Sequence, residues 1–575
     1  MQSFYEYLTA DNCDAIIRIL AKERVKQGGK NKLGRGSKSE IKAIMPPRSR
    51  WLRLRQSARC KGLSKETANT LSIRKTIASD IRRFSSDMSL APQYLKKLFE
   101  FLDKIMSAVT GDAPVQLFSD AFSIIAKFKE DKDGDAIYRP LCIYNDLLVK
   151  TLISTTSTYF TQAFDKHLHE EILSYRPRRL YHGKYTVTDG NNAITGIQEF
   201  IKKHNGKRIY VAECDIQKFF DIINSDVVLD CFDRLAAKAG LKDYHQARNI
   251  LKAYLDSYGF VPDVLAHNDN DNFWHMARKR HIGPIKGRCL FKWVKEEDFM
   301  QAYTPEEFQI QRSSLGVPQG GALSCVIANV VLNDVDQRII AEEDPGRFFA
   351  RYGDDIILIH TDREKCEALL ETYKNELLQH KLIFHRFEDF TNLKDGAKNT
   401  KAFWKGKSKP VFLWGPGEGN ASEWIGFVGY EIRFNGSTRL RIATLNKKFG
   451  DINKKYHKCL QSKQSDPAKL IEATISRMTA LPDSIRKFSA LTPSDDPRLN
   501  FYLEEQLRSL DRYRYKKIAK LDQKLGNRNL CTPGLTSHFE GAPETSYFWR
   551  IFKDKQGQAL YSTILSCKFS GRRSL

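Results

Sequence analysis

At 575 residues the chain is longer than a single hydrophobic core normally serves, which predicts three or four subdomains. Hydrophobic residues form 41% and aromatic residues 11% of the chain, enough to build packed cores, so a mainly disordered protein is excluded. The net charge of +24 favours a polyanionic partner, with nucleic acid as the leading candidate.

Residues 1–110 alternate amphipathic patches with stretches rich in Lys and Arg. Residues 22–61 hold fourteen Lys and Arg against two Glu. Such clustering favours contact with nucleic acid over charges that are merely scattered and solvated. Residues 1–110 are therefore predicted to form a basic helical N-terminal extension.

From residue 111 to 440 short β-branched and aromatic runs alternate with helical segments, which predicts an α+β domain. Residues 208–215 alternate with period two, so the predicted strand delivers Asp215 at its C-terminal end. Two β-prone runs, 348–352 and 356–360, flank a short turn. They predict a hairpin with Asp354 and Asp355 at its tip.

An insertion at about 235–310 and the region 441–575 flank or interrupt this domain. The insertion contains basic and aromatic residues, and two interpretations stay open: contact with a template strand by stacking and phosphate pairing, or an ordinary helical insertion. These residues include Trp274, Lys279, Arg280 and Lys286. Residues 441–575 have few strand formers and helical spacing of leucines, which predicts a basic helical thumb and C-terminal domain.

The cysteines and the apolar runs bear on the compartment. Eleven cysteines are spread singly with no C-x-x-C pair, which argues against a zinc ribbon or a disulfide framework and fits a reducing cytoplasm. No run approaches the ~20 apolar residues of a membrane span, and the first residues lack the pattern of a signal peptide. We expect a cytoplasmic protein without a membrane partner.

An acid pair in a turn is by itself common, because Asp favours turns. Here strongly apolar strands flank the pair, and burying adjacent acids without a cation is costly. Nucleotide transfer to a 3′-hydroxyl uses two divalent metals about 3.5–4 Å apart, and Mg²⁺ prefers carboxylate oxygens. We therefore predict that Asp215, Asp354 and Asp355 are catalytic residues that bind two Mg²⁺ ions, with Mn²⁺ as a substitute.

Three motifs in order resemble those of reverse transcriptases. The Tyr-Gly-Asp-Asp of residues 352–355 resembles their Tyr-x-Asp-Asp box, residues 215–221 resemble motif A, and residues 315–324 resemble motif B. The resemblance spans roughly residues 115–445. It implies a right-hand polymerase with fingers and palm, an antiparallel palm sheet and RNA-directed DNA polymerase activity. It further implies that Ile216 binds metal and substrate beside Asp215, and that Gln319 binds substrate.

Weaker matches extend the resemblance. Residues 138–143 and 174–179 resemble two finger motifs that hold the incoming triphosphate, which makes Arg139 and Arg176 candidates, since a guanidinium binds phosphate bidentately. A surface or RNA-contacting arginine stays an alternative for each. Residues 427–430 resemble the primer grip, although an aromatic core hairpin would look the same. Lys401 is the candidate proton donor to pyrophosphate.

Motif A also bears on the sugar. In reverse transcriptases the residue five after the motif A aspartate is aromatic and leaves no room for a 2′-hydroxyl, and Phe220 stands at that place. Viral RNA polymerases, which also carry Gly-Asp-Asp, have an acid there, whereas Asp221 is one residue late. The resemblance therefore implies use of dNTPs and a DNA product. Phe219 is predicted to belong to the core.

The chain is most similar to the defence-associated, abortive-infection-like reverse transcriptases of bacteria. It shows no paired Cys/His endonuclease spacing after residue 440 and no recognisable ribonuclease H or integrase pattern. That resemblance implies antiphage function with a noncoding RNA as template or scaffold. Retron-like and group II intron-like enzymes stay alternatives, although Gly353 differs from the alanine common in both. So do a non-catalytic RNA-binding scaffold and a homo-oligomer.

Overall fold

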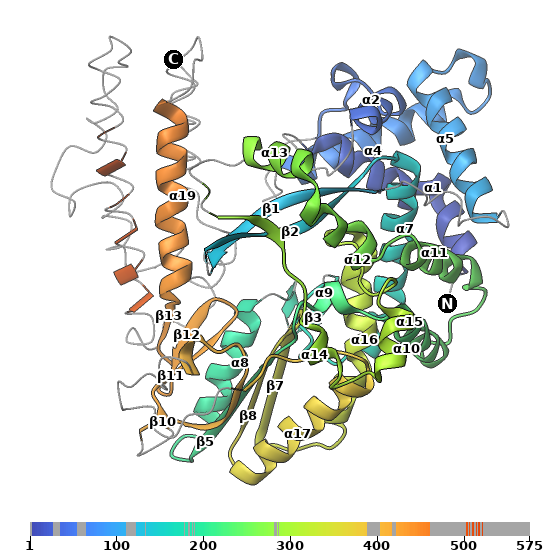
Figure 1. The fold of residues 1–575 in the computed structure, drawn as a ribbon. Coiled ribbons are helices and arrows are strands. Elements are labelled where there is room, and N and C mark those ends of the chain that lie inside the picture. The colour runs from blue at the N-terminus through green and yellow to red at the C-terminus, as the bar shows by residue number, and fades with distance from the viewer. Residues whose placement is uncertain are drawn as a thin grey trace.

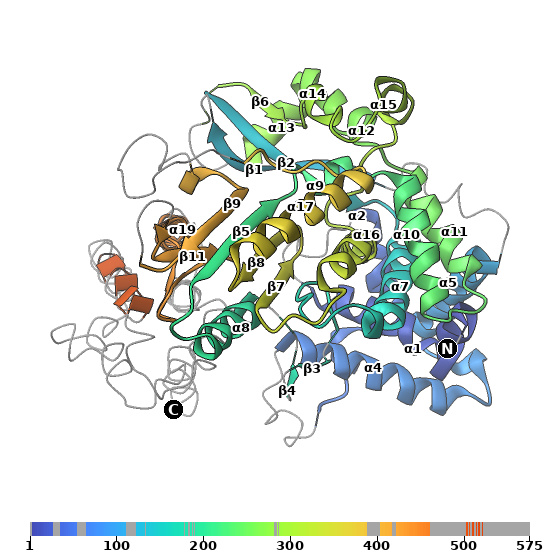
Figure 2. The ribbon, with the colours of Figure 1, turned by 90° about the horizontal axis from the view of Figure 1, so that it is seen from below.

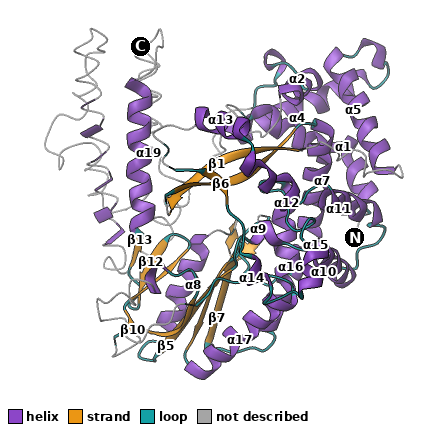
Figure 3. Ribbon diagram, in the orientation of Figure 1, coloured by secondary structure: helices purple, strands orange, loops and turns teal. Residues whose placement is uncertain are grey.

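The fold is taken from a computed structural model of the 575-residue chain (Figure 1). It describes residues 3–26, 35–54, 65–110, 122–280 apart from 133, 178, 182, 183, 187 and 189, then 285, 287–387, 403–416 and 421–460, and scattered residues between 502 and 520. Helices and strands both contribute, and most of the helices gather on the side of the molecule that holds the N-terminus (Figure 3). This mixture confirms the predicted α+β class.

A five-stranded sheet forms the predicted palm, with the order β10-β9-β5-β8-β7. Strand β5 runs antiparallel to both β8 and β9, and β7 runs antiparallel to β8, whereas the short β10 is parallel to β9. The predicted antiparallel palm sheet is therefore confirmed. The strands are β5 (Ile209–Asp215), β7 (Arg347–Tyr352), β8 (Asp355–His360), β9 (Lys409–Trp414) and β10 (Ala421–Ser422).

The two faces of this sheet pack against different layers (Figure 2). Side chains alternate along a strand, so Ala212 and Cys214 join the core that includes residues of α16 and α17, whereas Val211 joins a second core with α8 and the sheet β11-β12-β13. These layers are α8 (Gly190–Lys203), α16 (Ala322–Ile340), α17 (Arg363–Gln379), β11 (Trp424–Phe427), β12 (Tyr430–Arg433) and β13 (Thr438–Leu440). Asp215 therefore emerges at the end of a central, doubly covered strand.

A second sheet, β1-β2-β6, forms the fingers. Its first two strands form a long antiparallel hairpin, and β6 from the insertion pairs parallel to β2. Trp274 of the insertion is 4% exposed and packs on Tyr138 and Phe291, so the interpretation of this ring as a template contact is wrong. The elements are β1 (Phe122–Lys132), β2 (Asp135–Tyr144), α11 (His245–Asp256), α12 (Phe260–Asp263), η4 (Leu265–Asp269), α13 (Asp271–Arg280), β6 (Cys289–Phe291), α14 (Glu296–Phe299) and α15 (Pro305–Gln311).

Of the insertion's basic residues, Lys279 is exposed, and the side chains of Arg280 and Lys286 lie outside the described residues. The insertion supplies strand β6 to the fingers sheet, and its helices supply side chains to the core of the fingers. Template contact by these basic residues stays a prediction.

The predicted N-terminal extension is helical, but it does not stand apart from the rest. Its apolar side chains belong to the same hydrophobic core as α7 and the palm helices. Phe4 lies 5.1 Å from Tyr159 between ring centroids, and the buried Lys150 amino group lies 2.8 Å from Glu23. The helices are α1 (Phe4–Val25), α2 (Arg35–Ile44), η1 (Arg48–Arg50), α4 (Lys65–Phe84), η2 (Met88–Leu90), α5 (Gln93–Thr110), α7 (Leu147–Phe164) and η3 (Asp165–His167).

The C-terminal side begins with α19 (Ile442–Leu460), which follows β13 (Figure 1). Leu503 and Leu510 are buried in the core shared with α8, and Gln506 bonds both main-chain groups of Leu440 at 2.7 and 3.0 Å. The remaining elements are β3 (Arg179–Tyr181), β4 (Lys184–Thr186), α9 (Phe219–Ile222) and α10 (Ser225–Lys238). Among the helices that can be described, none is long and apolar enough to cross a membrane. The division at residues 110 and 440 stays a prediction.

Candidate active site

The three predicted carboxylates meet at one end of the palm sheet. Asp215 ends β5, and its Cα pairs directly with that of Asp355, the first residue of β8. Asp355 also pairs with Tyr352 at the end of β7, so Gly353 and Asp354 form the turn. Gly353 has φ +74°, a left-handed conformation that costs glycine little. The predicted hairpin is therefore confirmed, and β5 brings the distant aspartate to its tip.

Burial and neighbouring negative charge raise the pKa of Asp354 and Asp355. Desolvation, followed by the charges of Asp354 and Asp215, raises the pKa of Asp355 to about 7. Desolvation and the charge of Asp215 also raise the pKa of Asp354. A cation among these groups would relieve their repulsion, and three hard carboxylates are the donor set that a divalent ion such as Mg²⁺ prefers. The residues present therefore fit a divalent metal.

A cavity of about 1010 Å³ opens beside the acids. Asp215, Tyr352 and Asp355 line it from the palm, while residues of β11, β12 and β13 line it from the opposite side. At the β11–β12 turn, Phe427, Val428 and Gly429 line the cavity, although Phe427 is largely buried, as is Tyr430. The rings of this hairpin belong to the core, as one interpretation expected, and a primer grip at residues 427–430 stays a prediction.

A lysine that the sequence motifs did not single out contacts the acids. Lys407 Nζ donates to Asp215 Oδ2 at 2.6 Å. His385 lies 3.8 Å from the same oxygen, and desolvation together with the Lys407 charge lowers its pKa to about 4. Lys401, the predicted proton donor, lies outside the described residues. Four lysines lie between 401 and 409 without a distinctive spacing, so only their place in the fold could separate them.

The two finger arginines have different surroundings. Arg139 is exposed on β2, and its charge lowers the pKa of Asp354, although desolvation dominates that carboxyl. The Arg176 side chain is 2% exposed. Its guanidinium donates to the Asp165 carboxylate at 2.5 Å and to the carbonyls of Asp165 and His169 at 2.5 and 2.6 Å. The prediction that Arg176 binds triphosphate is therefore wrong, because protein acceptors already use its donors.

The side chain of Asp221 is buried and hydrogen-bonded within the protein. It is 1% exposed, and Gln319 Nε2 donates to its Oδ1 at 2.5 Å. Desolvation raises the Asp221 pKa to about 6. Phe220 beside it is only partly buried, whereas Phe219 is 2% exposed, which confirms the prediction that Phe219 belongs to the core. The Gln319 side-chain amide is hydrogen-bonded to Asp221. The predicted contact of Gln319 with substrate would therefore use its main chain, or its side chain after rearrangement.

Ile216 is 1% exposed and forms an antiparallel bridge with Phe384. Its side chain belongs to the core, as expected for the residue that follows Asp215 on the opposite face of the strand. Only its main chain can therefore reach a metal ion or a nucleotide.

A different group of side chains has three potential metal-ligand atoms within 4.8 Å of one another: Cys231, Asp334 and His380. Arg234 already donates to Asp334 at 2.7 Å and to Cys231 Sγ at 3.2 Å. Burial lowers the His380 pKa, but Asp334, Cys231 and the Glu376 carbonyl outweigh it and raise that pKa to about 10. Arg234 and a protonated His380 therefore already supply the positive charge that a metal ion would bring to this cluster.

Residues 129–386 match the family model described as "Reverse transcriptase (RNA-dependent DNA polymerase)". The chain thus contains a reverse transcriptase domain, which is an RNA-directed DNA polymerase domain with fingers and palm. Nothing among the curated proteins matches the chain.

Two of the solved structures that the chain resembles are telomerases. Apo telomerase from Candida tropicalis has 10% sequence identity and a TM-score of 0.32, with 100% of this chain and 86% of that chain covered. Telomerase from Candida albicans in complex with a TWJ fragment of telomeric RNA has 13% identity and a TM-score of 0.30, with 86% and 76% covered. With TM-scores below 0.5, both likenesses are distant.

Proposed function

We propose that the chain synthesises DNA from dNTPs by two-metal nucleotidyl transfer, with RNA as its template. The observation that carries this proposal is the pairing of Asp215 with Asp355 across β5 and β8, with Asp354 beside them at the turn. Asp215, the Ile216 main chain, Asp354 and Asp355 would hold two Mg²⁺ ions, for which Mn²⁺ can substitute. Such ions stabilise the charge that grows on the attacking and leaving oxygens.

The surrounding side chains would orient the nucleotide. Arg139 projects from the exposed side of β2 and would bind the triphosphate through its guanidinium fork. The Phe220 ring would lie under the sugar and exclude a 2′-hydroxyl, while Gln319 keeps Asp221 from bonding that hydroxyl. Lys407, 2.6 Å from Asp215, replaces Lys401 as our candidate for the group that protonates the departing pyrophosphate.

Purified full-length protein should incorporate labelled dNTPs on an RNA template with a DNA primer when Mg²⁺ or Mn²⁺ is present. EDTA should stop incorporation and added Mg²⁺ should restore it, because the three carboxylates need a divalent ion between them. Ribonucleotides supplied alone are the matched control and should give far less product. Absence of product with every primer and template, including copurified RNA, would favour a non-catalytic RNA-binding scaffold.

We further propose that this activity serves antiphage defence in the bacterial cytoplasm together with a noncoding RNA. The motif resemblance to defence-associated reverse transcriptases supports this role, and so does the basic helical extension that shares the palm core. No disulfide joins the cysteines whose side chains the structure describes, which supports the location. A retron-like or group II intron-like enzyme is the alternative.

The efficiency of plating of some phages should be lower on bacteria that express the chain than on bacteria that express the Asp354→Asn variant. Sequencing of RNA and DNA copurified with the protein should reveal one enriched noncoding RNA and its DNA copy. Equal plating of a broad phage panel on both strains would contradict the defence role and leave the polymerase proposal intact.

A further inference from the structure

The glycine of the catalytic turn is held through both of its main-chain polar groups. Gly353 N–H donates to Ser174 Oγ at 2.7 Å, and its carbonyl accepts from Arg351 Nη1 at 3.0 Å. Ser174 is 3% exposed and Arg351 is fully buried. Gly353 directly precedes Asp354, so these two bonds limit the rotation of the peptide groups that aim the Asp354 carboxylate.

Arg351 is itself fixed by helix α16. Its guanidinium lies 2.7–2.9 Å from the carboxylate of Asp336, and Nη1 also donates to Asn329 Oδ1 at 3.2 Å. A buried ion pair often adds no stability over a well-packed apolar pair, since both ions lose their hydration. The Arg351–Asp336 pair is therefore better explained by the fixed geometry that it gives the guanidinium than by a gain in folding stability.

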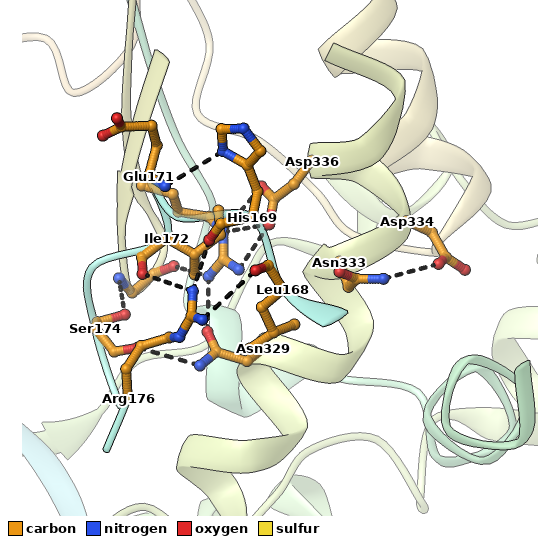
Figure 4. A network of polar contacts seen from close by, with 12 residues as sticks. Leu168, His169, Glu171, Ile172, Ser174, Arg176, Asn329, Asn333, Asp334 and Asp336 are labelled. Atoms are coloured by element: carbon orange, nitrogen blue, oxygen red, sulfur yellow. Dashed lines mark hydrogen bonds and ion pairs between the residues drawn. The ribbon is translucent and has the colours of Figure 1, made fainter. Parts of the chain in front are cut away.

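Ser174 belongs to residues 168–176, a segment that we call the strap (Figure 4). The strap lies along the outer edge of β7, where Ile172 forms a parallel bridge with Arg351. The strap bonds to both main-chain groups of Arg351: Arg351 N–H donates to Glu171 O at 3.2 Å, and Leu173 N–H donates to Arg351 O at 3.0 Å. Asn329 Nδ2 donates to Ser174 O at 3.1 Å. The turn at Gly353 is thus held by the strap through Ser174 and by α16 through Arg351.

The end of the strap is anchored and strained. The Arg176 guanidinium bonds to the Asp165 carboxylate and to main-chain carbonyls, and so anchors the strap. These bonds use the donors that were expected to bind phosphate. Tyr175, between Ser174 and Arg176, has φ +59°, a left-handed conformation that is unfavourable for a bulky residue. Such a conformation persists only where the surroundings impose it, and the bonds of Ser174 and Arg176 on either side hold Tyr175 in it.

We propose that Ser174, Asn329 and Arg351 are positioning residues that set the orientation of the Tyr352–Asp355 turn and thereby the metal-binding geometry of Asp354. The proposal rests on the polymerase function proposed above. Left-handed Gly353 permits the turn, and the two bonds to its peptide groups select one orientation from those that glycine allows.

The test uses Ser174→Ala and Arg351→Lys in the full chain. Alanine removes the acceptor for Gly353 N–H, and lysine keeps a positive charge for Asp336 but cannot supply the planar fork that also reaches Gly353 O. Each variant should lower kcat for dNTP incorporation about tenfold or more, because small misplacements of catalytic groups cost up to about a hundredfold. KM for dNTP should stay nearly unchanged. Mn²⁺ affinity, measured by electron paramagnetic resonance without nucleotide, should fall severalfold.

Two matched controls separate positioning from loss of folding. Arg347→Lys changes an arginine at the other end of β7 that bonds the carbonyls of Ile339 and Glu342. Ser157→Ala removes a hydroxyl that bonds the carbonyl of Ala322. Both controls should keep wild-type kcat and Mn²⁺ affinity at similar thermal stability. If Ser174→Ala and Arg351→Lys fold stably with wild-type kcat and Mn²⁺ affinity, or lose activity only in proportion to stability, the positioning role is overturned. Inactive wild-type protein would instead overturn the proposed function.

Discussion

Replacement of Asp354 by asparagine is expected to abolish DNA synthesis while the protein stays folded. Asparagine has nearly the same shape but lacks the negative charge that a divalent ion requires. A bound metal contributes several kcal/mol of charge stabilisation in the transition state, and about 1.4 kcal/mol corresponds to a factor of ten in rate. The expected loss in kcat is therefore about a thousandfold or more, measured by single-turnover incorporation of one labelled dNTP.

Asp256→Asn is the matched control for this experiment. Asp256 ends α11, is exposed and pairs with Lys252 at 2.6 Å, away from the palm. Removing that surface ion pair should cost at most about 1 kcal/mol of stability and leave kcat unchanged. The thermal unfolding temperature of Asp354→Asn should equal or exceed that of the wild type, because the substitution relieves repulsion from Asp215 and Asp355. Residual synthesis near the wild-type rate would remove Asp354 from the metal site.

Replacement of Phe220 by alanine is expected to admit ribonucleotides. The partly buried ring would no longer occupy the space under the sugar, so a 2′-hydroxyl could be accommodated. An apolar site discriminates against an added hydroxyl by about a hundredfold, and the ratio of kcat/KM for a dNTP to that for the matching NTP should fall by up to that factor. Competition between labelled dCTP and CTP on one primer–template measures it.

Phe219→Leu controls for the loss of an aromatic ring nearby. Phe219 is buried in the core, where leucine keeps most of its volume, so sugar selectivity should stay at the wild-type value. Asp221 offers a second comparison. Its carboxylate is held by Gln319, so Asp221→Asn should not change the discrimination against ribonucleotides. Unchanged selectivity in Phe220→Ala would show that another group excludes the 2′-hydroxyl.

Much of the palm could be predicted because its signals are local. Alternation along residues 208–215 and the two apolar runs around Gly353 specify strands, and a strand's end specifies where its last side chain emerges. The order of the three motifs then joined Asp215 to a hairpin more than a hundred residues away, and the register of β5 with β8 confirms that pairing.

Predictions about individual basic and aromatic side chains were less successful. Arginine and tryptophan are residue types suited to contact with nucleic acid. Arg176, however, donates its hydrogen bonds to Asp165 and to main-chain carbonyls. Trp274 is buried against Tyr138 and Phe291. Nothing near either residue in the sequence reveals these partners. Lys407 is the converse case, because its contact with Asp215 depends on how β9 pairs with β5.

The sequence by itself determined the α+β class, the palm strands and the three carboxylates, because periodicity, turn chemistry and motif order act over short stretches of chain. Only the tertiary structure decided what surrounds the carboxylates: Lys407 beside Asp215, Gln319 on Asp221, and the grip of Ser174 and Arg351 on Gly353. The physical reason is that the partners of a buried polar group come from segments far apart in the chain. Burial then decides whether an arginine binds a substrate or holds a turn in place.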